Sequence, residues 1–151
     1  TEIGVKLRKT KLLFDSVVWY DSVDANVRNM ILRWIQNDQL RQRGVDEFNE
    51  VIGYYSLATD FISGGKKKFN THFTLEDTGE FFREMFVTVM KDSLVIDSDG
   101  ADKIGDDGSQ TNLFTEYGNK IVGLNDENMG KLVEVLRPKY IKFARKVLEL
   151  D

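Results

Sequence analysis

The only histidine of the chain, His72, is the one side chain that could act as a general base near neutral pH. A catalytic triad would need a hydroxyl nucleophile on one side of its ring and a carboxylate on the other. Ser63, Thr71 and Thr74 are near His72 in the sequence, but their spacing matches no such arrangement. The chain has no cysteine, which excludes thiolate nucleophiles, thiolate zinc sites and disulfides within it. We therefore expect no catalysis, and a small hydrolase that uses His72 is an alternative.

Five aspartates lie between residues 97 and 107, and this acidic segment is the second candidate for chemistry. A calcium loop of the EF-hand type needs a glycine at its sixth position and a glutamate at its twelfth. Counted from Asp97, these positions hold Asp102 and Gly108, so the pattern fails at both anchors. We expect a solvated acidic loop with no metal and no other cofactor. A calcium- or metal-binding module through residues 97–107 is the alternative.

Basic residues are concentrated in two places, a lysine triplet after Gly64-Gly65 and the last stretch of the chain. The triplet lacks the spacing and the following Ser or Thr of a phosphate loop. With 21 basic and 25 acidic residues the net charge is 21 − 25 = −4, which argues against dedicated nucleic-acid binding. Opposed basic and acidic patches can instead steer copies of one protein into a ring. The residues predicted to contact neighbouring subunits or other partners are Lys66, Lys67, Lys68, Asp97, Asp99, Asp102, Asp106, Asp107, Lys131, Lys139, Lys142, Arg145 and Lys146. The basic last stretch and the acidic segment would meet neighbours around the ring, whereas residues 44–73 and the N-terminal segment would reach partners above or below it.

Two long amphipathic stretches must position these charged residues. Apolar residues recur at three- and four-residue steps from Val23 to about Arg43 and predict a helix that ends at Gly44. A second helix is predicted over residues 125–150, with Asn125 as its N-cap and a kink or break at Pro138.

Between the helices, residues 44–74 lack periodicity and predict a long irregular loop. A β-hairpin is predicted from residues 85–90 and 94–96, and the acidic loop of residues 97–108 follows it. A helical turn is then predicted over residues 112–117, and a short extended piece over residues 121–124. The fold class is α+β, with a small antiparallel sheet covered by the two long helices. We expect residues 1–22 to form an N-terminal segment or arm and residues 23–151 to form a single domain. The expected apolar anchors of the long loop are Tyr54, Tyr55, Phe61, Phe69 and Phe73.

A series of short motifs follows a fixed order through residues 40–150. A turn ending in Thr78-Gly79 precedes the strand pair, a segment ending in Tyr117-Gly118 follows it, and Leu124-Asn125-Asp126 opens the last helix. Upstream are Arg43-Gly44-Val45-Asp46 and Tyr55-Ser56-Leu57-Ala58-Thr59. The ordered series resembles the virion-morphogenesis and tail-completion proteins, which are head–tail connector components of tailed bacteriophages. Lys120-Ile121-Val122 stands where that family often has an arginine-proline step.

The resemblance implies a non-enzymatic structural protein of the phage neck or upper tail, present in the host cytoplasm during assembly. It implies a homo-oligomeric ring on the order of six or twelve copies. Portal-side connector and tail proteins would be its neighbours, with a passing contact to DNA in the channel and no membrane. Thr78, Gly79, Tyr117 and Gly118 would be the structural motif residues. The Asn- and Asp-rich style suggests a crAss-like phage as the source.

Overall fold

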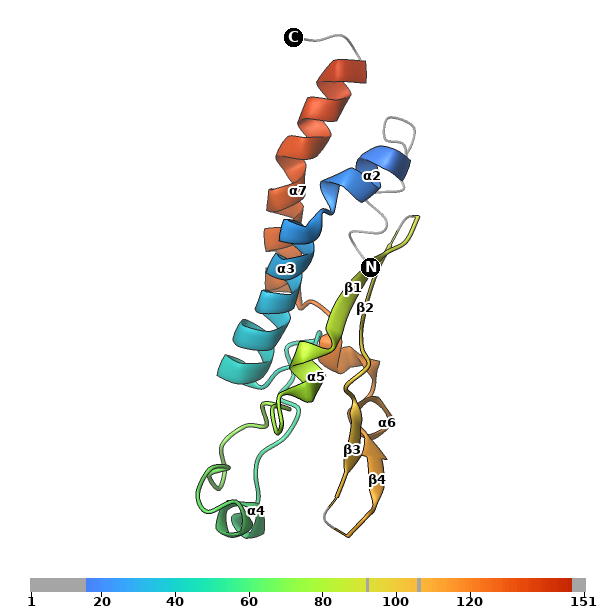
Figure 1. Cartoon of the computed structure of the whole chain (residues 1–151). Coiled ribbons are helices and arrows are strands. Elements are labelled where there is room, and N and C mark those ends of the chain that lie inside the picture. The colour runs from blue at the N-terminus through green and yellow to red at the C-terminus, as the bar shows by residue number, and fades with distance from the viewer. Residues whose placement is uncertain (1–15, 92, 106, 148–151) are drawn as a thin grey trace.

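The computed structural model describes residues 16–91, 93–105 and 107–147. The predicted N-terminal segment, residues 1–22, lies outside these residues as far as residue 15, and helix α2 (Ser16–Ser22) forms its remainder. Figure 1 shows an elongated molecule with helix α7 reaching one end. The short helix α4 and the strands β3 and β4 lie at the other end, which we call the lower end.

The first half contains a helical run that changes type along its length. Helix α3 (Ala25–Arg33) begins at Asp24, whose carboxylate accepts a hydrogen bond of 3.0 Å from the Val27 amide. It continues into the π-helix η1 (Trp34–Arg43), which ends at Gly44 with a φ of 61°. The predicted stop at Gly44 is thus confirmed, but one long N-terminal α-helix is not supported, since α-geometry covers nine residues. The wider π-turn places the adjacent residues Gln39 and Leu40 in the interior together.

The predicted long loop is irregular in outline and holds one short helix. Isolated bridges pair Val45 with Val51 and Tyr54 with His72. Between the second pair lies α4 (Leu57–Ile62), capped by the Ser56 side chain. From here on, the arm means residues 53–73, and residues 1–22 are called the N-terminal segment.

The predicted β-hairpin is confirmed. Helix α5 (Glu80–Arg83) leads into β1 (Met85–Val89), which pairs antiparallel with β2 (Leu94–Ser98). The acidic loop predicted over residues 97–108 is wrong, because Asp97 belongs to β2 and a second hairpin follows. That hairpin pairs β3 (Asp102–Ile104) with β4 (Gln110–Asn112). Its strands are mostly polar and exposed, so they lack the alternating hydrophobicity by which a strand is recognised.

The C-terminal half begins with α6 (Leu113–Tyr117), as predicted, and Asn112 caps it. The 3₁₀ turn η2 (Asn119–Val122) follows. The extended piece predicted over residues 121–124 is wrong, because its first two residues, Ile121 and Val122, belong to this turn, which buries both side chains. Helix α7 (Asp126–Val147) begins after Asn125, whose side-chain oxygen Oδ1 accepts a 3.0 Å bond from the Asn128 backbone amide, so the predicted N-cap is confirmed. The helix is continuous through Pro138, so the break that was one of the two expected outcomes is wrong, and the kink stays a prediction.

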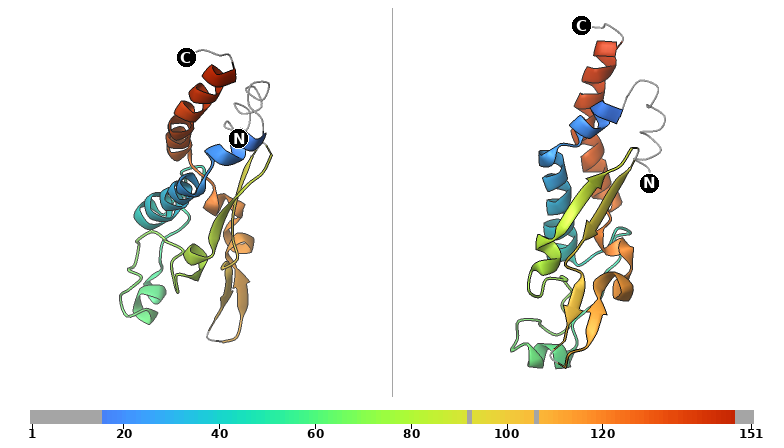
Figure 2. Two further views of the ribbon diagram at one scale, coloured as in Figure 1. Left: turned by 45° about the horizontal axis from the view of Figure 1, so that its top comes forward. Right: turned by 45° about the vertical axis from the view of Figure 1, so that its right-hand side comes forward.

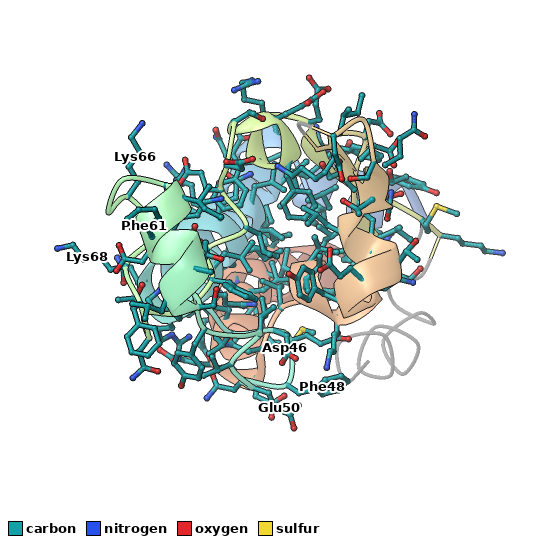
Figure 3. The ribbon with its side chains drawn as sticks, turned by 90° about the horizontal axis from the view of Figure 1, so that it is seen from below. Asp46, Phe48, Glu50, Phe61, Lys66 and Lys68 are labelled. Carbon is teal, nitrogen blue, oxygen red and sulfur yellow. The ribbon has the colours of Figure 1, made fainter. Side chains whose placement is uncertain are left out.

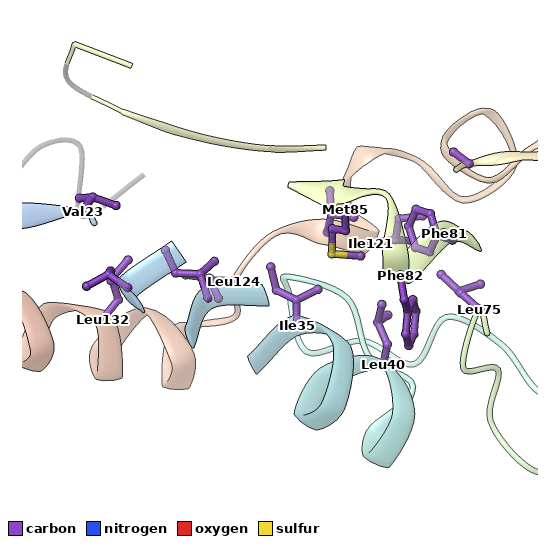
Figure 4. Close-up of a cluster of buried hydrophobic side chains, with 14 of the residues drawn as sticks. Val23, Ile35, Leu40, Leu75, Phe81, Phe82, Met85, Ile121, Leu124 and Leu132 are labelled. Atoms are coloured by element: carbon purple, nitrogen blue, oxygen red, sulfur yellow. The ribbon is translucent and has the colours of Figure 1, made fainter. Parts of the chain in front are cut away.

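The core lies where these helices meet the first hairpin (Figure 4). Ile35 and Leu40 of η1 face Phe81, Phe82 and Met85 from α5 and β1, while Ile121 fills the space beside them. Figure 2 shows α3, η1 and α7 on one side and the two hairpins, with α6, on the other. The result is a mixed helix and sheet fold with two small antiparallel hairpins and a C-terminal helix, as the α+β class requires. In the described ranges, no helix has the length and apolar character to cross a membrane.

Candidate assembly surfaces

The lower end of the molecule divides into two projections, the arm and the β3–β4 hairpin (Figures 1 and 2). A cavity of about 280 Å³ lies between them. Its wall includes Tyr55 and Phe73 from the arm and Ile104 and Thr111 from the hairpin. The two projections therefore face each other across this cavity, and their outer sides point away from each other.

Hydrogen bonds and aromatic contacts fix the base of the arm. The Tyr55 amide donates to the Thr71 carbonyl at 2.9 Å, and the Phe73 amide donates to the Gly53 carbonyl at 2.8 Å. The Phe73 ring lies against Tyr55, with centroids 4.9 Å apart, and meets Tyr117 edge-on at 6.0 Å. The arm is therefore anchored to helix α6 rather than hanging free. Burial raises the pKa of the Tyr117 phenol to about 12, so this contact stays neutral.

His72 also belongs to this base. Its Nε2 lies 2.8 Å from the carbonyl oxygen of Arg41, and its ring fills the space above Gly44. A Cβ at Gly44 would lie 2.5 Å from the ring, so only glycine fits there. Among the described residues, no hydrogen bond links His72 to a carboxylate or a hydroxyl. The geometry therefore gives His72 a structural contact and offers the hydrolase alternative no partner for the ring.

The tip of the arm exposes several apolar side chains, and one of them, Phe61, is among the five residues expected to anchor the long loop. Phe61 is 88% exposed and Ile62 is 84% exposed, with Leu57 on the same short helix at 68%. Only Tyr55 and Phe73 of the five expected anchors act at the base, whereas Tyr54 and Phe69 are also exposed. Local bonds define the tip: the Asp60 carboxylate accepts from the Phe69 amide at 2.9 Å. An ordered tip with a bare apolar face has the character of a contact surface.

The lysine triplet borders this apolar face. In Figure 3, Lys66 and Lys68 point away from the molecule beside Phe61. Both lysines are exposed, and neither makes an ion pair within the described residues. Lys67 instead turns toward the base, where its Nζ lies 3.3 Å from Asp77 and 5.9 Å from the centre of the Tyr55 ring. Two of the three lysines are therefore free for a partner.

The β3–β4 hairpin presents the opposite charge. Ile104 is 76% exposed in β3, and exposed aspartates surround it along the hairpin. The Asp102 carboxylate accepts a 2.7 Å bond from Asn112, and hydrogen bonds from Ser109 lower the pKa of Asp107. Within the described part of the chain, no ion pair involves these aspartates. Asp106 lies outside the described residues. The exposed aspartates from β2 to the tip of this hairpin are Asp97, Asp99, Asp102 and Asp107.

The predicted basic face of α7 is partly used inside the chain. Lys131 pairs with Glu127 one turn earlier at 3.8 Å, and Lys139 donates to the Ser22 carbonyl at 2.7 Å. Lys142 and Arg145 are exposed in the last turns, far from the lower end in Figure 1. The side chain of Lys146 lies outside the described residues.

The predicted structural motif residues lie at turns. The Thr78 hydroxyl accepts a 3.4 Å bond from the Glu80 amide at the start of α5. Gly79 has a φ of 83° and Gly118 a φ of 86°, a backbone region that glycine adopts without strain. These residues direct the chain into the core and, through Tyr117, brace the arm.

A buried polar cluster that the sequence analysis missed holds the corner between η1 and α7. The side chain of Gln39 is fully buried and makes three hydrogen bonds. Its Nε2 donates to the Gly123 carbonyl at 2.8 Å, while its Oε1 accepts from the Asn125 amide at 3.0 Å and from Asn128 Nδ2 at 2.9 Å. No sequence pattern identified Gln39, because its polarity places it outside the apolar periodicity.

Asp46 fixes the adjoining turn. Its carboxylate is almost fully buried and accepts bonds from the amides of Phe48 at 2.8 Å and Glu50 at 3.1 Å. The Lys120 ammonium lies 3.5 Å from its second oxygen. Figure 3 shows the turn on a different side of the lower end from the arm tip. The motif residues Asp46 and Asn125 therefore stabilise neighbouring turns at one corner.

The acidic residues give no support to a metal site. Across the ranges that the structure describes, no group of three or more histidine, aspartate or glutamate side chains could hold a metal ion. The aspartates instead spread along β2 and the second hairpin. No family model, curated protein or solved structure matches the chain. The candidate surfaces therefore stand on their own geometry.

Proposed function

We propose that this protein is a structural subunit, without catalytic activity, that assembles with copies of itself into a ring. The observation that carries the proposal is the arm: its base is fixed by aromatic contacts, yet Phe61 and Ile62 at its tip are almost fully exposed. Ordering such a tip leaves apolar surface in water, and burial against a partner would recover that free energy.

The place we propose for this ring is the head–tail connector, neck or upper tail of a tailed bacteriophage, as a tail-completion component. The ordered motif series supports this location. Its residues occupy architectural positions: Thr78-Gly79 opens α5, Tyr117-Gly118 ends α6, and Asn125 caps α7. A structural role for each motif suits a protein whose task is to hold a shape.

The proposed partners are other copies of the chain around the ring and, above and below it, portal-side connector and tail proteins. The elongated shape gives each subunit two ends in addition to its two sides (Figure 1). Contact with DNA in the channel would be passing, since the net charge of −4 opposes stable binding to a polyanion.

Measurement of the intact mass by native mass spectrometry and light scattering tests the proposal. We expect a discrete closed assembly whose mass is a fixed multiple of 17.4 kDa. Mass spectrometry of purified virions should also detect the chain. A protein that stays monomeric at high concentration and is missing from virions would refute the function.

A variant with Phe61→Asp and Ile62→Asp probes the observation that carries the proposal. Because both side chains are solvent-exposed, the variant should keep the melting temperature of the isolated chain. It should nevertheless fail to assemble. Unchanged assembly would show that the arm tip does not mediate the contact between subunits.

A further inference from the structure

We infer that the arm tip of one copy docks on the β3–β4 hairpin of the next copy, so that these two projections form the repeating contact of the ring. This inference rests on the proposed ring and names the surfaces that close it. It differs from a pairing of the acidic segment with the basic face of α7.

The positions of the arm and the β3–β4 hairpin suit a contact between neighbouring copies. A cyclic ring with a head-to-tail contact needs two different patches, on opposite sides of the subunit and at the same level along the ring axis. Figure 1 places α4 and the β3–β4 hairpin at the same lower end, and the view along the molecule in Figure 3 places them on opposite sides. The last turns of α7, with Lys142 and Arg145, lie at the far end instead.

The arm tip and the β3–β4 hairpin carry complementary surface patches. The arm tip has an apolar centre, Phe61 and Ile62, bordered by Lys66 and Lys68. The hairpin has an exposed apolar residue, Ile104, at the rim of the cavity; because side chains alternate along β3, Ile104 shares a face of the hairpin with the exposed Asp102. Protein interfaces bury an apolar centre within a polar rim, and opposite charges in the rim select and orient the partner.

In the part of the chain that the structure describes, the charges of both patches form no ion pair; Asp102 and Asp107 accept hydrogen bonds from uncharged groups of Asn112 and Ser109. Within the described residues, no ion pair involves Lys66, Lys68, Asp102 or Asp107. By contrast, Lys67, Lys131 and Lys139 are each paired within their own chain. The unpaired charges are thus the ones that border the exposed apolar residues, which makes a second copy a complementary occupant of each patch.

Charge exchange on the full chain tests the contact. One variant carries Lys66→Glu and Lys68→Glu, a second carries Asp102→Lys and Asp107→Lys, and a third carries all four changes. Each reversal alone should weaken subunit association by about tenfold or more at low salt. The combined variant should return to within about threefold of the original chain, because the opposed charges are restored with their signs exchanged.

A matched control carries Lys142→Glu and Arg145→Glu, which change the charge by the same amount at the far end of α7. Circular dichroism and melting temperature establish that every variant folds. The control should assemble like the original chain. This contact is overturned if the original chain assembles into a ring but the fourfold variant shows no recovery. It is also overturned if the control variant fails to assemble while the reversals have no effect. Both results leave the proposed ring. An original chain that never assembles overturns the proposed function itself.

Discussion

Replacement of Gln39 by leucine tests whether the buried polar cluster is essential to the fold. Leucine has nearly the same volume but cannot hydrogen-bond, so the change removes three bonds of 2.8 to 3.0 Å without opening a large cavity. It leaves the Gly123 carbonyl and the Asn125 amide without these partners, in a region where Asn125 and Asn128 are at most 2% exposed. The Asn128 side-chain amide loses one bond and keeps its 3.0 Å bond to Asp38.

The magnitude follows from these three bonds. A net contribution of roughly 1 kcal/mol per bond, together with a desolvation penalty for the stranded groups, gives a loss of about 3–6 kcal/mol in the free energy of unfolding. Domains of this size are stable by only about 5–15 kcal/mol, so the variant should lose a large part of its stability.

Equilibrium unfolding in urea, followed by tryptophan fluorescence, measures this loss. Gln42→Leu provides the matched control, because Gln42 is exposed in the same π-helix and makes no side-chain hydrogen bond within the described residues. The control should change stability by less than about 0.5 kcal/mol. A loss below about 1 kcal/mol for Gln39→Leu, with an unchanged slope against urea, would refute the assignment of the cluster as a structural centre.

Three further changes test separate contacts. Gly44→Ala should lower the melting temperature by several degrees, because its Cβ would meet the His72 ring at 2.5 Å and its φ is 61°; an unchanged thermal unfolding curve would contradict this. Ser98→Ala should cost about 1–3 kcal/mol, because the buried hydroxyl donates to the Phe81 carbonyl at 2.7 Å, and urea unfolding would detect it. Burial, reinforced by the neighbouring carboxylate of Asp46, raises the pKa of Glu47 above its ordinary value of 4.5. The native state therefore binds the carboxyl proton more tightly than the unfolded state, so it loses stability as the pH rises past about 4.5. Glu47→Gln should therefore raise the melting temperature at pH 7 but not at pH 4, and equal effects at both would exclude this cause.

The elements that the sequence predicted best are those with a regular apolar pattern. The residues of β1 and β2 alternate, and α7 combines an apolar stripe with a capping asparagine, so both were identified with nearly correct bounds. Strand β3 is Asp102-Lys103-Ile104, with no apolar alternation to reveal it. The local bond from Asn112 to Asp102 across the hairpin is invisible to an argument from hydrophobicity.

The candidate surfaces were predicted in part, for a similar reason. Exposure of Lys66 and Lys68 followed from their charge, but the exposure of Phe61 and Ile62 contradicts their hydrophobicity. Aromatic residues in an irregular segment are expected to anchor it, and only tertiary packing distinguishes Phe73, which packs against Tyr117, from Phe61, which is 88% exposed. Which apolar side chains of an irregular segment are buried and which are exposed is therefore not predictable from one sequence alone.

The polar cluster also has a consequence for the order in which the chain folds. Its bonds from Gln39 join residues that are 84 to 89 positions apart, whereas each hairpin and the arm close over short distances. Closing so long a loop costs more entropy than forming a local hairpin. During synthesis the hairpins and the arm emerge before Asn128, so they form while the π-helix still lacks its partner. The corner at Gln39 is therefore completed only when the start of α7 has been synthesised, so this helix fixes the end of a π-helix made more than 80 residues earlier.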